Sequence, residues 1–235
     1  MLRTVWVVFV STIATLIYAP LVTVVALLWR SNAAFIDRLI RQWARAIVRS
    51  AGIDLRVEGQ ELLDPSRRYI FLPNHASYFD IPCIFAGIEQ PTRFMAKASL
   101  FKIPIFGWGL SAAGFIPVDR KNRKTAVQSF DLAASRIREG HSIVIFPEEG
   151  RTRTGKMKPF QRGGFLLALK SGLPIMPLAI AGTWEVMPAT RFRVTAGPVT
   201  LRIAPPIETE SMSIRAKDEL METTRQQISM MLGRA

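Results

Sequence analysis

Short apolar runs alternate with helix-like stretches from residue 53 to the end of the chain. Runs rich in β-branched and aromatic residues are typical of strands, and apolar positions three or four apart are typical of helices. The predicted strands are Leu55–Glu58, Tyr69–Leu72, Arg93–Ala96, Phe115–Val118, Ser142–Phe146, Ile175–Ala181 and Thr200–Ile203. The predicted helices are Ile81–Ile88, Leu100–Phe106, Lys124–Arg138, Gly163–Ser171 and Ser213–Leu232. This alternation predicts α/β architecture, with a mostly parallel central sheet flanked by helices.

The beginning of the chain has a different pattern. Residues 4–29 carry no charge and lie between Arg3 and Arg30. This length is close to that of a helix that crosses a bilayer, which needs roughly 20 apolar residues. Because Pro20 is expected to kink the helix, a straight span, a pair of short re-entrant or interfacial helices, and a buried core helix all stay open. A cleaved signal peptide fits less well, since its apolar core is usually about 7–15 residues long.

Residues 33–52 are predicted to form an amphipathic helix, with Trp43 on its apolar face. Four arginines gather on another face: Arg38, Arg41, Arg45 and Arg49. This pattern fits a helix at the surface of an anionic membrane, and equally a helix docked on the domain with a solvated basic side. The change of pattern at Gly52 divides the chain into N-terminal membrane-anchoring helices (1–52) and a second domain (53–235).

Charge and rare residues narrow the range of partners. The chain has 235 residues, with 31 Lys or Arg and 18 Asp or Glu, so its net charge is +13. This surplus favours a membrane surface, a nucleic acid, or an acidic substrate or protein. A nucleic acid is not expected, because the charge accompanies an apolar N-terminal segment and no binding motif. The single cysteine, Cys83, and the two histidines, His75 and His141, argue against a disulfide and against a metal site.

Polar clusters directly follow three of the predicted strands. They consist of His75 with Asp80, Asp119 with Arg120, and Glu148 with Glu149, Arg151 and Arg153. In open α/β sheets ligands bind beyond the carboxyl ends of the strands, so parallel strands would bring all three clusters to one edge. A general base would then face arginines, which bind phosphate or carboxylate oxygens in pairs. The implied substrate carries a proton to be removed and an anionic group to be held.

His75 and Asp80 form the candidate catalytic pair. Histidine accepts a proton near neutral pH, and a carboxylate on its other ring nitrogen fixes the tautomer and stabilises the imidazolium. Asp80 would also suit as the N-cap of a helix that begins at Ile81, and the two roles are compatible. Other charged residues fit solvated positions as well: Glu148 could pair with Arg151 on the surface, and Arg120 and Lys97 could lie in exposed loops.

Together these motifs resemble the glycerolipid acyltransferases of the bacterial 1-acyl-glycerol-3-phosphate acyltransferase type. The ordered blocks are NHASYFD (family pattern NHxxxxD; His75, Asp80), GFIPVDR (Gly114, Arg120), FPEEGRT (usually FPEGTRS; Phe146, Pro147, Glu148, Arg151) and LPIMPLAI (Pro177). The stretch KASLFKIPIFG, with Lys97, Pro104 and Gly107, is also similar to the family pattern. The resemblance covers residues 57–183 and identifies residues 53–235 as an acyltransferase domain.

The resemblance implies transfer of a fatty acyl chain from an acyl thioester to the sn-2 hydroxyl of 1-acyl-glycerol-3-phosphate. The product would be phosphatidic acid, made in phospholipid biosynthesis. His75 would remove the proton of the attacking hydroxyl, and Asp80 would orient and charge-stabilise His75. The implied substrate-binding residues are Lys97, Arg120, Glu148 and Arg151.

The resemblance also implies the partners of the chain. No metal or organic cofactor is expected, and the co-substrate would be a thioester of acyl carrier protein or of coenzyme A. The other partners would be a lysophospholipid acceptor and an anionic membrane, and the expected location is the inner, cytoplasmic face of the cell membrane.

One departure keeps alternatives open. Glu149 stands where the family usually has Gly, and Gly150 where it usually has Thr. An extra carboxylate beside a phosphate-binding arginine weakens anion binding unless it points away, so another lysolipid acceptor, such as a lyso-aminolipid, stays open. Two other functions also stay open. The first is a hydrolase that uses His75 with Ser77, which would lose activity without Ser77. The second is a non-enzymatic basic membrane-binding protein, which would be unchanged by loss of His75.

Overall fold

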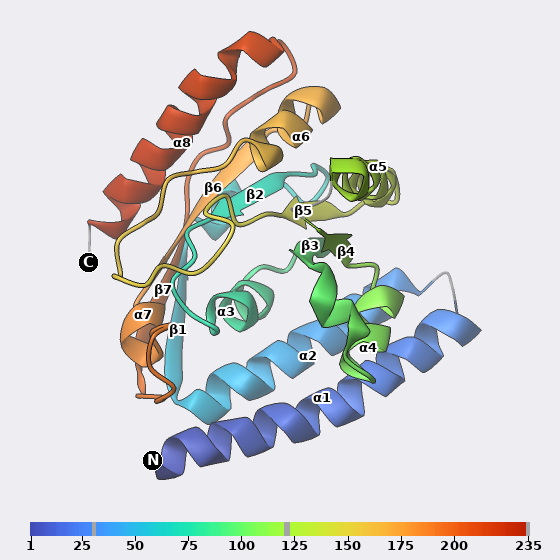
Figure 1. Cartoon of the computed structure of the whole chain (residues 1–235), viewed down its shortest axis with the longest axis vertical. Helices are drawn as coiled ribbons and strands as arrows, with labels where there is room; N and C mark the ends of the chain where they lie inside the picture. Colours follow the sequence, from blue (N-terminus) through green and yellow to red (C-terminus); the bar gives the residue numbers. More distant parts are fainter. Residues whose placement is uncertain (30–31, 120–122, 234–235) are drawn as a thin grey trace.

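The computed structural model describes residues 1–29, 32–119 and 123–233 (Figure 1). A seven-stranded sheet lies at its centre, in the order β1-β7-β6-β2-β5-β3-β4. The strands are β1 (Ile53–Glu58), β2 (Ile70–Pro73), β3 (Thr92–Lys97), β4 (Ile116–Val118), β5 (Ser142–Val144), β6 (Ile175–Ala181) and β7 (Gly197–Ile203). Neighbours pair in parallel except β6 with β7. The predicted mostly parallel α/β sheet is confirmed.

The strand directions determine where polar residues can gather. Strands β6, β2, β5, β3 and β4 all run the same way, because each neighbouring pair among them is parallel. Their carboxyl ends therefore lie along one edge of the sheet, as the three polar clusters require. Strand β2 is buried at all four positions, which fits its unbroken apolar sequence and its place in the middle of the sheet.

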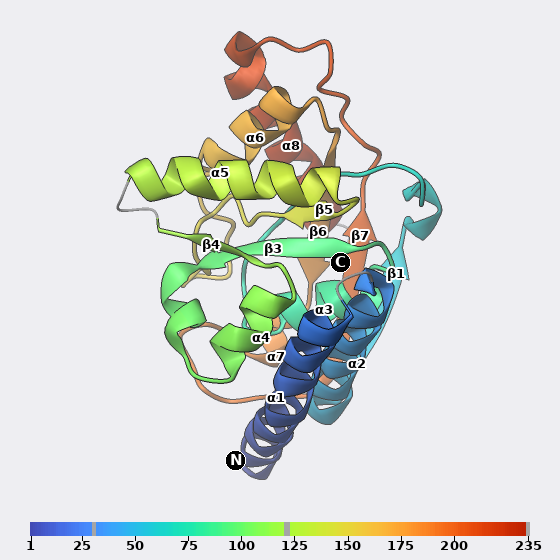
Figure 2. The same ribbon diagram turned by 90° about the vertical axis from the view of Figure 1, so that its right-hand side faces the viewer.

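Helices cover both faces of the sheet (Figures 1 and 2). They are α1 (Leu2–Leu28), α2 (Ala33–Ala51), α3 (Asp80–Gly87), α4 (Phe106–Ala112), α5 (Arg123–Arg138), α6 (Gly163–Ser171), α7 (Thr183–Val186) and α8 (Lys217–Leu232). Phe71 points into a core shared with α1, α2 and α3, whereas Ile70 and Leu72 point into a core shared with α6 and α8. This alternation follows from the two-residue period of a strand.

Helices α1 and α2 pack together and onto the rest of the molecule. α1 is one helix that continues through Pro20, so it is not a pair of short helices. By length and composition it could cross a membrane, and only 17% of its most apolar window is buried, which is consistent with membrane association. The apolar face of α2 is buried in the protein, as expected for the docked-helix alternative. Gly109 of α4 permits close packing on α1, because a Cβ there would lie 2.7 Å from Ala19 Cβ.

The structure corrects one predicted helix and adds two others. The predicted helix Leu100–Phe106 is instead a short 3-10 helix (Ala98–Lys102) followed by α4, which begins only at Phe106. Ile103 between them is extended because it precedes Pro104, and a residue before proline is disfavoured in the helical region. Helix α7 was not predicted, nor was α4 beyond its first residue. The division into domains at residue 52 stays a prediction.

Candidate active site

His75 and Asp80 lie side by side after strand β2. The Nδ1 of His75 is 2.7 Å from Oδ2 of Asp80, whose side chain is completely buried. Because Oδ2 also accepts two backbone N–H groups, we assign the shared hydrogen to Nδ1, which makes Nε2 the basic nitrogen. This arrangement lets His75 act as a general base through Nε2.

Asp80 is held by the loop that it organises. Its Oδ2 also accepts the backbone N–H groups of Ala76 and Ser77, at 2.7 and 2.8 Å. Its Oδ1 accepts the hydroxyl of Thr183 at 2.6 Å. The alternative that Asp80 is the N-cap of the helix is therefore wrong. Asp80 is the first residue of α3, and it bonds to residues that precede it. These bonds fix the carboxylate in one orientation toward His75.

The ring of His75 is also held from the neighbouring strand. Phe146, just beyond β5, stacks on the imidazole with ring centroids 3.8 Å apart and an interplanar angle of 25°. Glu148 accepts the backbone N–H of His75 at 2.6 Å through Oε1 and that of Lys158 at 2.7 Å through Oε2. Burial raises the pKa of Glu148, although these two backbone bonds oppose the rise. The carboxylate of Glu148 thus joins the His75 loop to the segment after β5.

Arg151 is held against the same loop. Its Nε donates to the carbonyl of Ser77 at 3.0 Å, and its guanidinium carbon lies 3.8 Å from the centroid of the Tyr78 ring. Burial lowers the pKa of Arg151, while the nearby Asp80 raises it. Glu148 and Arg151 therefore have separate partners and do not form the surface pair that the sequence left open. Arg151 and His75 both line one cavity.

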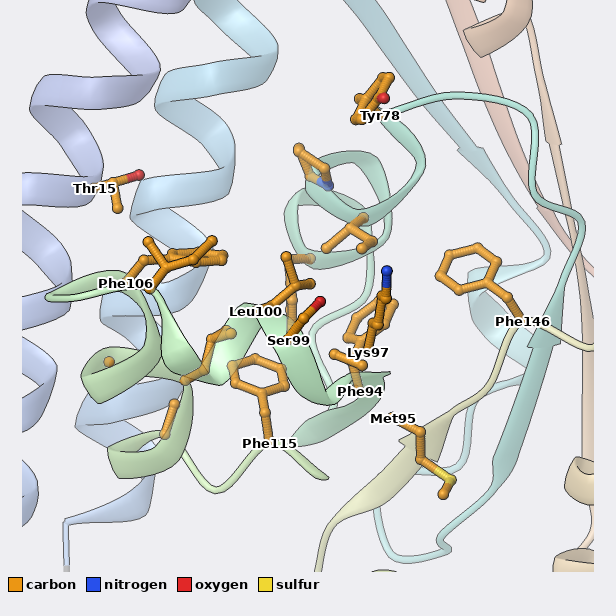
Figure 3. Close-up of a pocket in the computed structure, with 18 of the residues that line it drawn as sticks. Thr15, Tyr78, Phe94, Met95, Lys97, Ser99, Leu100, Phe106, Phe115 and Phe146 are labelled. Carbon is orange, nitrogen blue, oxygen red and sulfur yellow. The ribbon is translucent and has the colours of Figure 1, made fainter. Parts of the chain in front are cut away.

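The cavity beside His75 has a volume of about 1670 Å³ (Figure 3). Pockets for small ligands usually measure about 300–1,000 Å³, so there is room for a long flexible molecule. Most of the wall is apolar and comes from α1, α3, α4 and β3, including the contacting rings of Phe94 and Phe115. The polar part includes His75, Lys97 and Arg151. Such a wall is suited to an aliphatic chain, and the polar part to a charged headgroup.

The other predicted site residues are placed as follows. Lys97 is exposed and lines the cavity, where Figure 3 shows it in the same pocket as Phe146. Asp119 also lines the cavity, and Arg153 is exposed. Arg120 lies outside the described residues. The structure thus brings together the clusters after β2 and β5, whereas the binding roles of Lys97, Arg120, Glu148 and Arg151 stay predictions.

Ser77 and Cys83 could be nucleophiles by residue type, but both side chains are buried in the structure. The hydroxyl of Ser77 is buried, donates to the carbonyl of Met187 at 2.7 Å and accepts from the N–H of Phe79 at 3.2 Å. Cys83 is completely buried, and its burial raises the pKa of the thiol, which keeps it protonated. These surroundings weigh against the Ser77 hydrolase.

Glu149 adopts a conformation that favours glycine. Its φ is 56°, in the left-handed region, where a side chain costs about 1–2 kcal/mol. This explains physically why the family pattern has Gly at this position. Glu149 also lines the cavity, so its side chain stays relevant to the choice of headgroup.

Thr183 and Tyr78 were not singled out from the sequence. Thr183 follows β6 just as the predicted clusters follow their strands, so the same rule could have found it. Tyr78 lies within the NHASYFD block, but its contact with Arg151 joins positions far apart in the chain, and no local pattern shows it.

Comparisons with known proteins agree with this geometry. The sequence model of the family described as Acyltransferase matches residues 54–181. A 1-acyl-sn-glycerol-3-phosphate acyltransferase of Limnanthes douglasii is 33% identical over 73% of this chain and 60% of its own length. The protein of that name from Pseudomonas aeruginosa is 27% identical over 94% of this chain and 90% of its own length.

A solved structure is similar over nearly the whole chain. The crystal structure of PlsC, the 1-acyl-sn-glycerophosphate (LPA) acyltransferase of Thermotoga maritima, has a TM-score of 0.86 and 26% identity. The match covers 99% of this chain and 94% of that one. By contrast, the chain spans 34%, 60% and 51% of the plant relatives from Brassica napus, Limnanthes douglasii and Cocos nucifera.

Proposed function

This chain belongs to the acyltransferase family, and we propose that it transfers a fatty acyl chain from a thioester to the sn-2 hydroxyl of 1-acyl-glycerol-3-phosphate. The product is phosphatidic acid, a precursor in phospholipid biosynthesis. The observation that carries the proposal is the 2.7 Å contact of His75 Nδ1 with buried Asp80, on the wall of a largely apolar cavity of about 1670 Å³. Relatives of this name, and the similar PlsC structure, support the choice of acceptor.

The reaction balances with His75 alone moving the proton. Nε2 of His75 takes the proton of the acceptor hydroxyl as its oxygen attacks the thioester carbonyl. The new C–O ester bond forms, the C–S bond breaks, and the imidazolium returns the proton to the leaving thiolate. Asp80 stabilises the imidazolium between these steps. No covalent acyl-enzyme is required, because hydroxyl and thioester react directly.

Cations at the cavity hold the acceptor phosphate. Arg151 is aimed by Tyr78 and by the Ser77 carbonyl, and Lys97 lines the same cavity. Arg120 completes this set in the proposal. Glu148 acts as a positioning residue, since its carboxylate bonds to the backbone of His75.

The proposed partners follow from the reaction. The donor is a thioester of acyl carrier protein or coenzyme A, and no metal or organic cofactor takes part. Both the acceptor and the product are amphiphiles that stay in the bilayer, so we place the enzyme on an anionic membrane, at its cytoplasmic face. The apolar helix α1 supports the association with a membrane.

The test is acyl transfer by the full chain in membranes. Lysophosphatidic acid and a phosphate-free lysolipid are offered in parallel, each with carrier-bound and coenzyme-A-bound acyl donors. We expect selective acylation of lysophosphatidic acid, and its loss by at least about a hundredfold in His75→Ala, because general-base catalysis contributes about 10²–10⁴-fold. His141→Ala is the matched control, since His141 lies outside the cavity wall.

Each other outcome has a definite meaning. Acylation of only the phosphate-free lipid would keep the chemistry and overturn the acceptor. Activity that needs Ser77, judged by a folded Ser77→Ala variant, would favour a hydrolase. Transfer that is equal in wild type and His75→Ala would overturn the enzyme proposal.

A further inference from the structure

A loop at the cavity rim exposes an aromatic side chain between two cations. Residues 187–196 connect α7 to β7, and Phe192 in this loop is 71% exposed although it lines the cavity. Its neighbours Arg191 and Arg193 are also exposed. A single exposed apolar residue needs no explanation, but an aromatic ring flanked by arginines is typical of segments at an anionic membrane interface.

The loop has a defined conformation. The N–H of Arg191 donates to the carbonyl of Pro188 at 3.1 Å, and that of Arg193 to the carbonyl of Arg191 at 2.9 Å. Val194 is buried in the same core as α1 and α2. Phe192 is therefore held in solvent by the turn around it.

Both ends of the loop are tied to functional parts of the molecule. The N–H of Val194 donates to the hydroxyl of Thr4, in the first turn of α1, at 3.0 Å. The carbonyl of Met187 accepts the hydroxyl of Ser77, which lies two residues beyond His75. Residues 187–196 thus join the beginning of α1 to the loop that contains His75 and Ser77.

The exposed apolar surface of α1 continues toward this loop. Val5, Trp6 and Phe9 are 67%, 55% and 58% exposed, and Val8, 43% exposed, lines the same cavity as Phe192. Figures 1 and 2 both show the orange loop beside the N-terminal half of α1. A bilayer that contacts this half of α1 would therefore reach the loop as well.

We propose that residues 187–196 are a second membrane-contact segment, in which Phe192 enters an anionic bilayer and Arg191 and Arg193 bind its headgroups. The inference rests on the membrane association proposed above and extends it from α1 to the rim of the active site. Contact at two points would hold the cavity opening at the level where the headgroup of a lysolipid lies. Because Ser77 bonds to Met187 of this segment, the loop that contains His75 would be held at the same level.

Site-specific fluorescence tests the contact without using activity. Because the native Cys83 is completely buried, a cysteine placed at an exposed position is labelled selectively. Thr190→Cys keeps Phe192 and both arginines, Phe9→Cys reports on α1, and Gln226→Cys on α8 is the control. Each variant of the full chain carries an environment-sensitive dye and is transferred from detergent to vesicles of phosphatidylcholine, with or without phosphatidylglycerol.

We expect a blue shift and quenching by nitroxide-labelled lipid at positions 190 and 9, and neither at 226. Phosphatidylglycerol should strengthen the signal at 190. Phe192→Ser, or Arg191→Ser with Arg193→Ser, should reduce the signal at 190 several-fold and leave that at 9 unchanged.

Three results would overturn the inference. If the dye at 190 stays in water while that at 9 enters the bilayer, α1 alone makes the contact. If neither enters, the membrane association itself fails, a result independent of acyl transfer measured in detergent micelles. If the signal at 190 instead rises with protein concentration in the absence of lipid, the partner is a second copy of the chain.

Discussion

At the scale of single residues, Asp80 is the centre of the site. One carboxylate receives the His75 ring, two backbone N–H groups of its own loop, and the hydroxyl of Thr183, which follows the neighbouring strand β6. Hydrogen bonds to a charged group are worth about 1.5–3 kcal/mol each, so these four contacts hold the carboxylate firmly in one position. Its neighbours can therefore be tested one atom at a time.

Thr183→Val removes the hydroxyl that donates to Asp80 and keeps the shape of the side chain. We expect kcat to fall about tenfold or more, because a loss of about 1.4 kcal/mol in transition-state stabilisation has that effect. With one donor fewer, Asp80 holds more negative charge toward His75, so the acidic limb of the kcat/KM profile should move to higher pH.

Thr183→Ser should restore both rate and profile, since it returns the hydroxyl. A Thr183→Val variant with a lowered Tm but an unchanged rate and pH profile would show that Thr183 only supports the fold.

Glu148→Gln tests the second buried carboxylate. An amide offers one acceptor oxygen, so either His75 or Lys158 loses its backbone partner, at a cost of about 1–3 kcal/mol. Since burial raises the pKa of Glu148, its contribution to stability is fully present below the ordinary value of 4.5 and is lost as pH rises through the raised pKa.

The free energy of unfolding of the wild type, relative to Glu148→Gln, should therefore fall as pH rises above about 4.5. Unfolding followed by circular dichroism over a series of pH values measures this difference. A difference that stays constant with pH would contradict the raised pKa.

At the scale of elements, α2 is attached to the sheet by a buried ion pair. Asp37 of α2 accepts a hydrogen bond from Arg93 of β3, and both side chains are largely buried. Burial lowers the pKa of Arg93, and Asp37 counteracts this effect. The N-terminal helices are thus joined to the sheet by charge as well as by apolar packing.

Asp37→Ala should lower the free energy of unfolding by about 3–5 kcal/mol, because it leaves a buried guanidinium without its partner. The matched control is Arg45→Ala, which removes the exposed pair between Arg45 of α2 and Glu89. Such exposed pairs are worth at most about 1 kcal/mol. Thermal unfolding of both variants makes the comparison, and equal effects would show that α2 does not depend on the buried pair.

At the scale of the whole molecule, positive charge and apolar surface act on a membrane over different distances. The net charge of +13 attracts anionic membranes from a distance, whereas the exposed side chains of α1 act only on contact. The apolar contact involves the site itself, because α1 and His75 line the same cavity.

Salt separates the two contributions. Raising the ionic strength from about 0.01 M to about 1 M shortens the Debye length from about 30 Å to about 3 Å. Binding to vesicles that contain phosphatidylglycerol should therefore weaken several-fold, and binding to phosphatidylcholine alone should change little. Vesicle flotation measures both, and equal salt dependence on the two lipids would show that net charge does not direct the chain to anionic membranes.

The sequence by itself determined the α/β class, the parallel strands and the local blocks. Strand and helix periods are local properties, and so is the five-residue spacing that brings His75 to Asp80 in one loop. The polar clusters were predictable as well, because each directly follows a strand. The helix predicted at Leu100–Phe106 was wrong. The prediction followed the apolar spacing and ignored Pro104, which keeps Ile103 out of the helical conformation. This effect of proline is local, so the sequence could have shown it.

Only the tertiary structure decided the contacts between distant segments. The bonds from Thr183 to Asp80 and from Glu148 to the His75 backbone join residues 103 and 73 positions apart. Strand order sets these contacts, and periodicity carries no information about order. The cavity has the same origin: α1, the loop of Phe192 and His75 all line it because burial of apolar surface brings separate elements together, irrespective of their distance in the chain.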